Sequence, residues 1–433
     1  MSISTAFSSL KIRNYRRYFA GQVLSLCGTW AQTIGLGWLV LRLSHNSGVA
    51  VGLATALQFV PVLLFGLWAG LLADRFDKRR FIIGTQVSLA SIAALLAVVD
   101  LTGVVTLWMV YVFAFVFGMA TAADTPARLS FVVEMVGPRD LPNALGLNSA
   151  VVNAGRIIGP AIAGIVIAAG GTGFCFVVNA VSYVGTIAAV SSMRRGDLRQ
   201  PSPVVRGRGQ VRAGVRYTWR MPLLRSNILL LGLVSVVAFN FPVILPLLAK
   251  LTFRGDASTY SLMASAMGIG ALVSALVIAS IRRPHGRRLA IAVLGLGLAM
   301  CLGAMAPTLT TFLLLMPLIG AGQVVAASTS NAMIQLDSDP AMRGRVTAIF
   351  SLASQGLTPA GSLLCGVVAQ AAGARWGMAM GGIGALLAVG IFGLPLLRNR
   401  GPETDKLPGA EAEVAVQPMA EPGPPPGASA LPG

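Results

Sequence analysis

GLLADRFDKRR, from Gly70 to Arg80, places six charged side chains within seven positions. Long apolar segments flank this stretch on both sides, at 49–73 and 81–100. A helix needs roughly 20 apolar residues to cross the hydrocarbon core of a bilayer. The stretch therefore predicts a short charged loop between two membrane-spanning helices.

The composition of the whole chain points the same way. It has 433 residues, of which 55% are hydrophobic and 11% charged, and its mean hydropathy is +0.75. Soluble domains carry about 25% charged residues. Here too few charged side chains remain to cover a globular surface, so most of the chain must face lipid. This excludes a soluble enzyme, a collagen-like chain and a disulfide-stapled scaffold, and it predicts an all-α integral membrane protein.

Twelve segments are long and apolar enough to cross a bilayer. They are expected at 18–41, 49–73, 81–100, 105–125, 143–169, 174–193, 226–250, 258–281, 288–306, 309–335, 346–372 and 376–397. The first follows a basic stretch, as a signal peptide would. It is too long for one and lacks a small-residue cleavage site, so we expect it to be retained as a span.

Positive charge is distributed unevenly between the loops. The formal net charge is +18, from 33 Lys and Arg against 15 Asp and Glu. With a cytoplasmic N-terminus, the outer loops hold only Arg42, Lys250, Arg254 and Arg375, and Arg156 lies within a span. Cytoplasmic loops are enriched in Lys and Arg, so both termini are predicted to be cytoplasmic, in a bacterial inner membrane. The charge then marks topology and not a nucleic-acid surface.

The spans divide evenly around a polar, arginine-rich segment at 194–225, in which a short surface helix is expected near 211–220. The loop sequences DRFDKRR and RRPHGRR, and the glycine pairs Gly159/Gly164 and Gly361/Gly366, repeat ~200 residues apart. Two similar halves with a substrate site between them are typical of transporters. The expected organisation is a cytoplasmic N-terminus (1–17), a six-helix bundle (18–193), a cytoplasmic linker (194–225), a second six-helix bundle (226–397) and a disordered cytoplasmic tail (398–433).

The charged loop resembles a signature of the major facilitator superfamily. That signature is a glycine, three further residues, then Asp-Arg and a basic cluster. It is matched here by Gly70, Asp74-Arg75 and the basic residues that follow. Asp77 departs from it, because the superfamily usually has glycine there. The resemblance implies that Asp74 meets the positive N-terminus of span 11, a contact worth about 0.3–1 kcal/mol when exposed.

The same motif is thereby given a gating role. The missing side chain of Gly70 lets another helix approach closely. Asp124, expected at the cytoplasmic end of span 4, is a candidate partner for Arg75 or Arg79. The alternative interpretation is that these charges only mark the cytoplasmic ends of helices.

A second motif, in span 5, resembles the signature of facilitator antiporters. It consists of Gly146, Gly155, Gly159-Pro160 and Gly164. The small residues clear one face of a helix, and Pro160 removes a backbone donor and can bend it. Such a helix suits rocking of the two halves or sealing of a cavity; ordinary small-residue packing is the alternative.

Further stretches resemble the enterobactin-exporter-like branch of the superfamily: PARLSF at 126–131, LPNALGLNS at 141–149 and RGRV at 343–346. The resemblance covers about 10–397. It implies two pseudo-symmetric six-helix bundles and a proton-coupled exporter that works by alternating access.

Arg156 lies thirteen positions into span 5, about 20 Å from its cytoplasmic end at 1.5 Å per residue. A charge at this depth costs at least ~2.5–3.5 kcal/mol unless it faces a cavity or a partner. Arg156 is therefore a candidate for holding an anionic substrate group or for polarising a proton carrier. A structural arginine bonded to backbone carbonyls is the alternative.

No acidic residue is expected at mid-span, so Asp124 and Asp100, at span ends, remain as candidates for proton coupling. Span 7 contains Asn240, Pro242 and Pro246 and is predicted to be broken near mid-height. The embedded polar residues are expected either to line a cavity or to bridge helices: Gln22, Gln32, Gln58, Asn148, Asn153, Asn240, Gln323, Asn331 and Gln355. The candidates for an apolar cavity wall are Trp30, Trp38, Phe59, Trp68 and Phe239.

The sequence predicts no enzyme, metal or cofactor, because it shows no nucleophile–base pair and its two histidines and four isolated cysteines offer no ligand cluster. It predicts a monomeric secondary transporter that exports a siderophore-like metabolite or an amphipathic drug, with protons as the coupling ion. An importer of a small solute, and a non-transporting receptor or scaffold on the same fold, stay open as alternatives.

Overall fold

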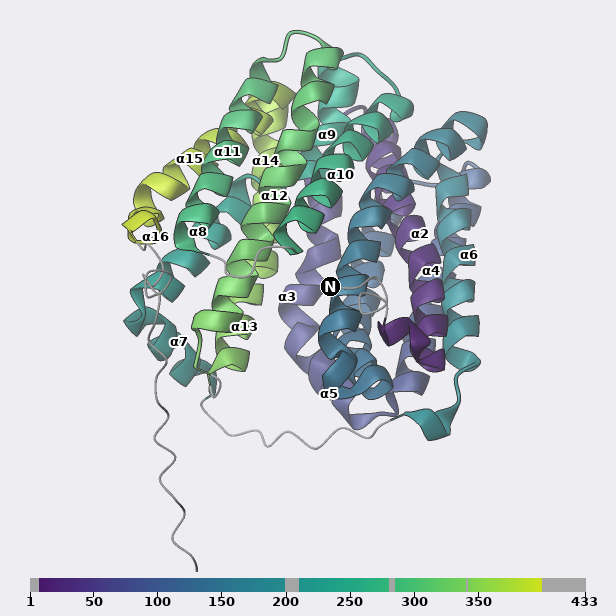
Figure 1. Cartoon of the computed structure of the whole chain (residues 1–433). Helices are drawn as coiled ribbons and strands as arrows, with labels where there is room; N and C mark the ends of the chain where they lie inside the picture. Colours follow the sequence, from purple (N-terminus) through teal and green to yellow (C-terminus); the bar gives the residue numbers. More distant parts are fainter. Residues whose placement is uncertain (1–7, 199–209, 280–284, 340–341, 399–433) are drawn as a thin grey trace, which may run out of the picture.

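The computed structural model describes residues 8–198, 210–279, 285–339 and 342–398. Within these ranges the chain is helical (Figure 1). Twelve helical segments are long and apolar enough to cross a membrane, which confirms the predicted number of spans for the described residues. Each span buries one face inside the protein and leaves large apolar side chains such as Leu95, Val181 and Leu276 exposed toward the surroundings.

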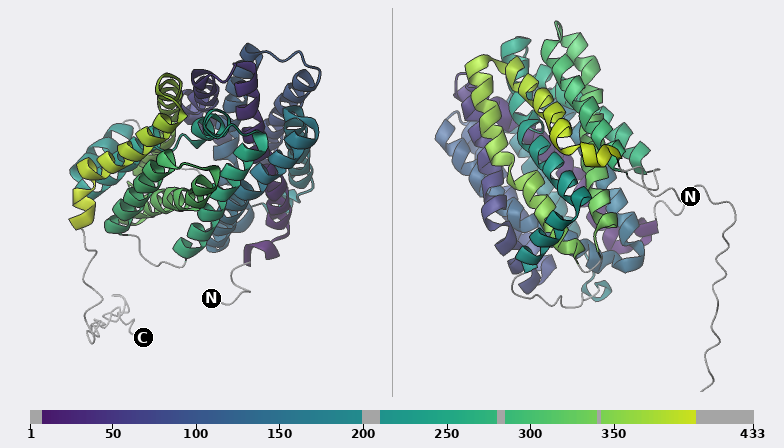
Figure 2. Two further views of the ribbon diagram at one scale, coloured as in Figure 1. Left: turned by 90° about the horizontal axis from the view of Figure 1, so that it is seen from above. Right: turned by 90° about the vertical axis from the view of Figure 1, so that its left-hand side faces the viewer.

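The helices of the first half are η1 (Ser8–Lys11), α2 (Arg13–Leu43), α3 (Gly48–Arg75), α4 (Lys78–Leu101), α5 (Leu107–Gly170), α6 (Thr172–Ser191) and η2 (Arg195–Asp197). Those of the second half are α7 (Gln210–Arg220), α8 (Pro222–Val237), α9 (Phe241–Leu247), η3 (Leu248–Thr252), α10 (Ala257–Ala279), α11 (Gly286–Met305), α12 (Leu309–Asp337), α13 (Arg343–Ser351), η4 (Leu352–Gly356), α14 (Thr358–Ala372), α15 (Ala374–Phe392) and α16 (Leu394–Arg398). Figure 2 shows the resulting two bundles side by side.

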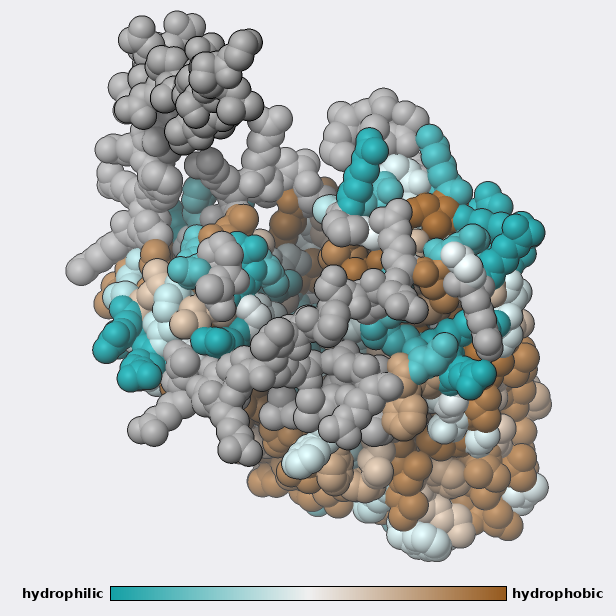
Figure 3. All heavy atoms as spheres, turned by 90° about the horizontal axis from the view of Figure 1, so that it is seen from below, coloured by the Kyte–Doolittle hydropathy of each residue, from teal (hydrophilic) through white to brown (hydrophobic). Residues whose placement is uncertain are grey.

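The bundle has two chemically different ends. We call the end where α3 passes into α4, and where α7 lies, the basic end, and the opposite end, with the loops at 44–47 and 253–256, the distal end. Hydrophilic residues gather on the basic end, whereas the flank is hydrophobic (Figure 3). Arg42, Lys250 and Arg375 lie near the distal end, as the distribution of charge along the sequence predicts.

Helix α5 departs from the expected pattern of two spans joined by a loop. The sequence predicts spans at 105–125 and 143–169, but the helix continues to Gly137 and resumes at Arg139. Gly137 alone is non-helical, at φ 72° and ψ 176°, a conformation that glycine adopts without steric cost. Charged side chains in this segment lower its mean hydropathy, so the hydropathy pattern does not predict that the helix continues here. Its apolar residues are nevertheless buried against α2, in a cluster that includes Phe131, Met135 and Tyr15.

Span 7 is interrupted, as its sequence predicts. Helix α8 ends at Val237 and α9 begins at Phe241, with Pro242 in its first turn. A π-helical turn, η3, completes the span, and a similar turn, η4, interrupts span 11 between α13 and α14. Such turns within long helices are frequent at functional sites.

The described part of the predicted linker contains α7, which confirms the helix expected near 211–220. Helix α7 packs on α13: a Cβ atom added to Gly214 would lie 2.8 Å from Cβ of Arg345. The hydroxyl of Tyr217 also accepts a hydrogen bond from the backbone amide of Asp339 at 3.1 Å. The tail expected to be disordered lies outside the described residues beyond Arg398.

The two halves approach most closely toward the distal end. A Cβ atom added to Gly366 of α14 would lie 2.4 Å from the carbonyl oxygen of Gly48 in α3. On the other side of the interface, a Cβ atom on Gly164 of α5 would lie 3.0 Å from Cβ of Ser261 in α10. Glycine at these positions allows helices of opposite halves to pack backbone against backbone.

Candidate functional site

The first half contains a buried ion pair. Nε of Arg128 lies 2.5 Å from Oδ2 of Asp124, one helical turn away on α5. Asp124 is only 5% exposed, and its Oδ1 accepts hydrogen bonds from Oγ1 of Thr85 at 2.6 Å and from Nε2 of Gln86 at 2.9 Å, both on α4. The carboxylate is thus held by two helices.

Arg128 extends this network to a third helix. Its NH1 donates to Oε1 of Gln22 on α2, and Nε2 of Gln22 donates to the hydroxyl of Tyr18 at 2.5 Å. Both α2 residues are buried. The network, from here on the Asp124 network, comprises Tyr18, Gln22, Thr85, Gln86, Asp124 and Arg128.

A pocket of about 260 Å³ adjoins the Asp124 network. It is lined by residues of α2, α4, α5 and α6: Tyr18, Gln22, Ser25, Leu26, Thr29, Leu89, Phe117, Thr121, Asp124, Thr125, Arg128, Leu129, Val132, Leu145, Asn148, Val152 and Tyr183. Its α2 residues fall in the first half of that helix, which starts at the basic end. We call it the inner pocket. The buried Asp124–Arg128 pair therefore borders a pocket that lies closer to the basic end of the bundle than to the distal end.

The predicted partners of Asp124 are wrong where the structure describes them. Asp124 does not lie at a helix end but thirteen residues before Gly137, and it pairs with Arg128. Arg79 instead donates to the carbonyl oxygens of Val190 and Ser191, at 3.0 Å and 2.5 Å. A cation there stabilises the C-terminus of α6, where the helix dipole is negative.

The other predicted gating residues belong to the last turns of α3. Gly70, Asp74 and Arg75 continue that helix to its end at the basic end of the bundle. Their side chains lie outside the described part of the structure, so the gating role stays a prediction.

The span-5 motif divides between different neighbours. A Cβ atom on Gly159 would lie 2.4 Å from Cβ of Trp30, and one on Gly155 would lie 3.1 Å from Cδ1 of the same residue. These two glycines therefore seat α5 on α2 within the first half, whereas Gly164 faces the second half. Gly146 has open space around it, and the helix continues through Pro160 without a break.

Arg156 lies on the same stretch of α5. Its guanidinium carbon is 5.3 Å from the centre of the Trp30 ring, within the range of a cation–π contact. Nε of Arg156 is buried without a hydrogen-bond partner. Among the described residues, its side chain makes no ion pair.

Four further polar candidates bond to a neighbouring helix or to their own helix, or lie exposed, and none of these four lines the inner pocket. Oε1 of Gln32 accepts from Nδ2 of Asn179 at 2.7 Å and so joins α2 to α6. Asn153 donates to its own helix at Ser149. Nδ2 of Asn240 donates to the carbonyl of Val236 at 2.6 Å, while Oδ1 is buried without a partner. Gln355 is exposed in η4.

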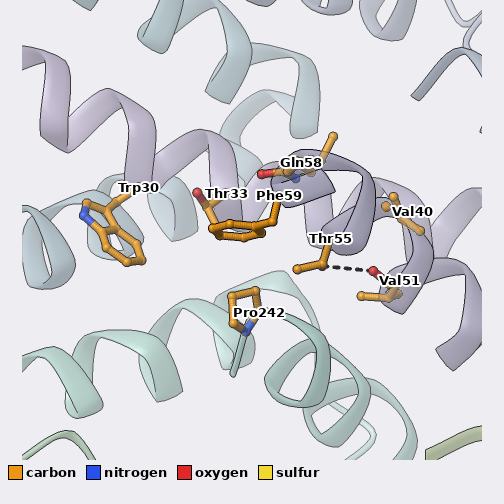
Figure 4. A pocket seen from close by; sticks show the side chains of 11 residues that line it. Trp30, Thr33, Val40, Val51, Thr55, Gln58, Phe59 and Pro242 are labelled. Atoms are coloured by element: carbon orange, nitrogen blue, oxygen red, sulfur yellow. Dashed lines mark hydrogen bonds between the residues drawn. The ribbon is translucent and has the colours of Figure 1, made fainter. Parts of the chain in front are cut away.

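A second cavity, of about 130 Å³, lies between the halves (Figure 4). It is lined by Trp30, Thr33, Leu36, Gly37, Val40, Val51, Ala54, Thr55, Gln58, Phe59 and Pro242. Pro242, at the break in span 7, closes the side opposite α2 and α3. We call it the central cavity. Four residues singled out from the sequence thus share one cavity: Trp30, Gln58, Phe59 and Pro242.

Sequence reasoning missed a set of contacts that closes the distal end. Oε1 of Gln370, at the end of α14, accepts hydrogen bonds from Oγ of Ser47 at 2.7 Å and from the backbone amide of Val49 at 3.0 Å. Nζ of Lys250 lies 5.7 Å from the centre of the Trp38 ring. Both contacts join the first half to the second.

Asp100 has a structural role at the same end. Its Oδ1 lies 2.5 Å from NH2 of Arg42, and its Oδ2 accepts from Oγ1 of Thr172 at 2.5 Å. Asp100 is 8% exposed. It ties α2, α4 and α6 together within the first half, away from both cavities.

A comparison with protein families matches residues 4–422 to the family described as transmembrane secretion effector. The chain belongs to this family of the major facilitator superfamily. The resemblance to the major facilitator superfamily, and that of the further stretches to its enterobactin-exporter-like and drug efflux branch, is thereby confirmed. The names of the family and of its relatives are those of transporters, so the chain is a transporter and not an enzyme.

Individual relatives agree with this assignment. The staphyloferrin A transporter of Staphylococcus aureus is 25% identical over 381 residues, covering 87% of this chain and 94% of the relative. The multidrug efflux pump Tap of Mycobacterium tuberculosis is 28% identical over 366 residues, covering 81% and 86%. A structure of an auto-inhibited peptide transporter of the POT family shares the fold, with a TM-score of 0.71 at 14% identity over 92% of this chain and 99% of that one.

Proposed function

We propose that the protein is a proton-coupled exporter of a bacterial inner membrane. It carries a siderophore-like metabolite or an amphipathic drug outward by alternating access, as a monomer. The relatives named for staphyloferrin A and for multidrug efflux support this cargo. The basic end faces the cytoplasm in this proposal, since Lys and Arg concentrate in cytoplasmic loops.

The observation that carries the proposal is the buried Asp124–Arg128 pair beside the inner pocket. Ionisable groups within membrane spans are costly and mark ion or proton pathways. A proton arriving at Asp124 would neutralise the carboxylate and weaken its hold on Arg128. The hydrogen bond of Arg128 to Gln22 would then be left as its main contact. Protonation would in this way change how α5 is held against α2 and α4.

The arrangement of the cavities supports a transport path. Cargo would enter the inner pocket from the basic end and reach the central cavity, which the contacts around Gln370 separate from the distal end. Opening these contacts while the basic end closes would release the cargo on the other side. The broken span 7, whose Pro242 lines the central cavity, is suited to bend during this step.

Inverted membrane vesicles, which expose the cytoplasmic side, test the proposal. We expect respiration-driven acidification of the lumen to drive uptake of at least one of three dyes: anionic dansylglycine, neutral dansylglycinamide or cationic ethidium. A protonophore should abolish this uptake. Uptake of none of the dyes would contradict export, and uptake that survives the protonophore would contradict proton coupling.

Two carboxylate variants sharpen the experiment. Asp124→Asn should lose coupled uptake, because it removes the group that takes up the proton. Asp256→Asn, in the loop between η3 and α10, is the matched control and should keep it, because this exposed carboxylate lies outside the spans. Equal uptake by the two variants would exclude Asp124 as the coupling residue.

A further inference from the structure

Arg156 lies on α5 one turn beyond a residue of the inner pocket and contacts a residue of the central cavity. Along α5, Leu145, Asn148 and Val152 line the inner pocket. Arg156 follows Val152 by one turn and is eleven residues after Leu145, a spacing that returns to the same helix face at 3.6 residues per turn. Its neighbour Trp30 lines the central cavity. Arg156 therefore continues the wall of one space and contacts the wall of the other.

The charge of Arg156 is not compensated within the described residues. Asp124 and Arg128 neutralise each other, and Asp100 pairs with Arg42. Arg156 makes no ion pair, and its Nε is buried without a partner. The residue as a whole is still partly exposed, so other atoms of the side chain remain accessible. A guanidinium in this situation lacks the anion that its planar donors match best.

The backbone at Arg156 is fixed against the second half. A Cβ atom added to Gly268 of α10 would lie 2.7 Å from the carbonyl oxygen of Arg156. Oγ of Ser265, also on α10, donates to the carbonyl of Ile157 at 3.2 Å. An anion bound to Arg156 would therefore sit next to the surface along which the halves move.

The surroundings also indicate what accompanies the anion. The Trp30 ring lies beside the guanidinium. Trp30 and Phe59 line the central cavity (Figure 4), whose apolar walls also include Leu36. Polar groups are few there, among them Thr33 and Gln58. This combination matches a molecule with one anionic group on an apolar body.

We infer that Arg156 is the anion-recognition residue of the transport site and that the cargo is an anionic amphiphile bearing a carboxylate or a similar group. This inference rests on the proposed function, since it assigns the substrate class of the same path. Its chemistry is a bidentate guanidinium–carboxylate contact, with the apolar body stacked along Trp30 toward the central cavity.

Binding measurements on the detergent-purified full chain test the inference without energisation. Dansylglycine and dansylglycinamide share one apolar body and differ in charge. Binding is followed as dansyl emission sensitised by tryptophan excitation. We expect the wild type to bind the carboxylate at least tenfold more tightly than the amide. Arg156→Gln should reduce the difference to within twofold and leave amide binding unchanged, and Arg156→Lys should retain an intermediate preference.

The outcomes separate the inference from the proposed function. Unchanged amide binding by Arg156→Gln shows that this variant is folded, and Arg156→Lys provides a second, charge-retaining variant. Equal binding of the two probes by the wild type, or a preference that survives in Arg156→Gln, would overturn the anion site. Vesicle uptake of ethidium alone would overturn it as well while leaving the exporter intact, whereas uptake of no dye counts against the proposed function.

Discussion

The side chain of Gln370 caps the N-terminus of a helix in the other half of the protein: its Oε1 lies 2.7 Å from Oγ of Ser47 and also accepts the amide of Val49. The first turn of α3 has free backbone donors and a positive dipole end. An acceptor carried by α14 thus satisfies donors of α3 only while the distal end is closed.

Replacing Gln370 is expected to open the distal end. Gln370→Leu removes two hydrogen bonds between the halves, each worth about 0.5–1.5 kcal/mol, and so shifts the equilibrium toward the open form by roughly tenfold. The measurement is labelling of a cysteine at Thr55→Cys, in the central cavity, by a membrane-impermeant maleimide added from the distal side. Gln370→Glu, which keeps the acceptor and adds a favourable charge, is the control and should not raise labelling. Faster labelling in the Glu variant than in the Leu variant would refute this role.

The Asp124–Arg128 pair should show strong coupling in stability. Removing one partner of a buried ion pair typically costs about 3–5 kcal/mol of stability, because the other partner is left as a buried charge without compensation. We expect Asp124→Asn and Arg128→Gln each to lower the melting temperature clearly, and the double variant to recover part of the loss. Thermal unfolding in detergent measures this. Additive losses in the double variant would show that the two groups do not interact.

The close approach of α3 and α14 should not tolerate a side chain. A Cβ atom on Gly366 would lie 2.4 Å from the carbonyl oxygen of Gly48, so Gly366→Val is expected to keep the distal end from closing and to stop export. Gly390→Val, in α15, is the matched control, since nothing lies within 4 Å of a Cβ atom there. The maleimide assay should report high distal accessibility for Gly366→Val and wild-type accessibility for Gly390→Val; the reverse order would contradict the packing argument.

The loop motif offers a pair of neighbouring acids with different expected effects. Asp74→Asn and Arg75→Ala should abolish export with near-normal expression if the motif gates the basic end. Oδ1 of Asp77 caps α4 by accepting the amide of Arg80 at 2.8 Å, and asparagine caps equally well. Asp77→Asn should therefore export normally. Wild-type export by Asp74→Asn would remove the gating role.

Asp256 gives a pH-dependent contribution to stability. Its carboxylate accepts the backbone amide of Thr259 at 3.0 Å at the start of α10, and this hydrogen bond lowers its pKa below the ordinary 3.8. A carboxylate with a depressed pKa stabilises the fold above its unfolded-state pKa, and the contribution is lost as the pH falls through the folded-state value. Asp256→Ala should thus unfold at a lower temperature than the wild type at pH 7, and this difference should shrink as the pH falls below the unfolded-state pKa. A difference that persists at low pH would contradict this origin.

The sequence predicts those features that depend on local hydropathy and helix breakers. Such patterns predict twelve spans, the interruption around Asn240 and Pro242, and the helix near 211–220. The described part of the structure contains all three features. The continuation of α5 to Gly137 does not follow, because Glu134 and Arg128 lower the hydropathy of a segment that packing against α2 keeps helical.

The candidate site was accessible from sequence only in part. The spacing of Asp124 and Arg128, one helical turn apart, indicates an ion pair once the segment is known to be helical. The partners of Asp124 on α4 and the pairing of Ser47 with Gln370 depend on which helices lie side by side. Contacts across such sequence separations are decided by tertiary packing, which local patterns do not encode.

Gly137 has a mechanical consequence for coupling. Asp124 and Arg156 occupy the two arms of α5, and this single residue is the only non-helical point between them. In the proposed mechanism, movement of the Asp124 arm is transmitted to the Arg156 arm through this covalent junction, without a relay of side chains. Lengthening that junction by a few flexible residues would preserve each arm's chemistry and yet let the proton gradient dissipate without work.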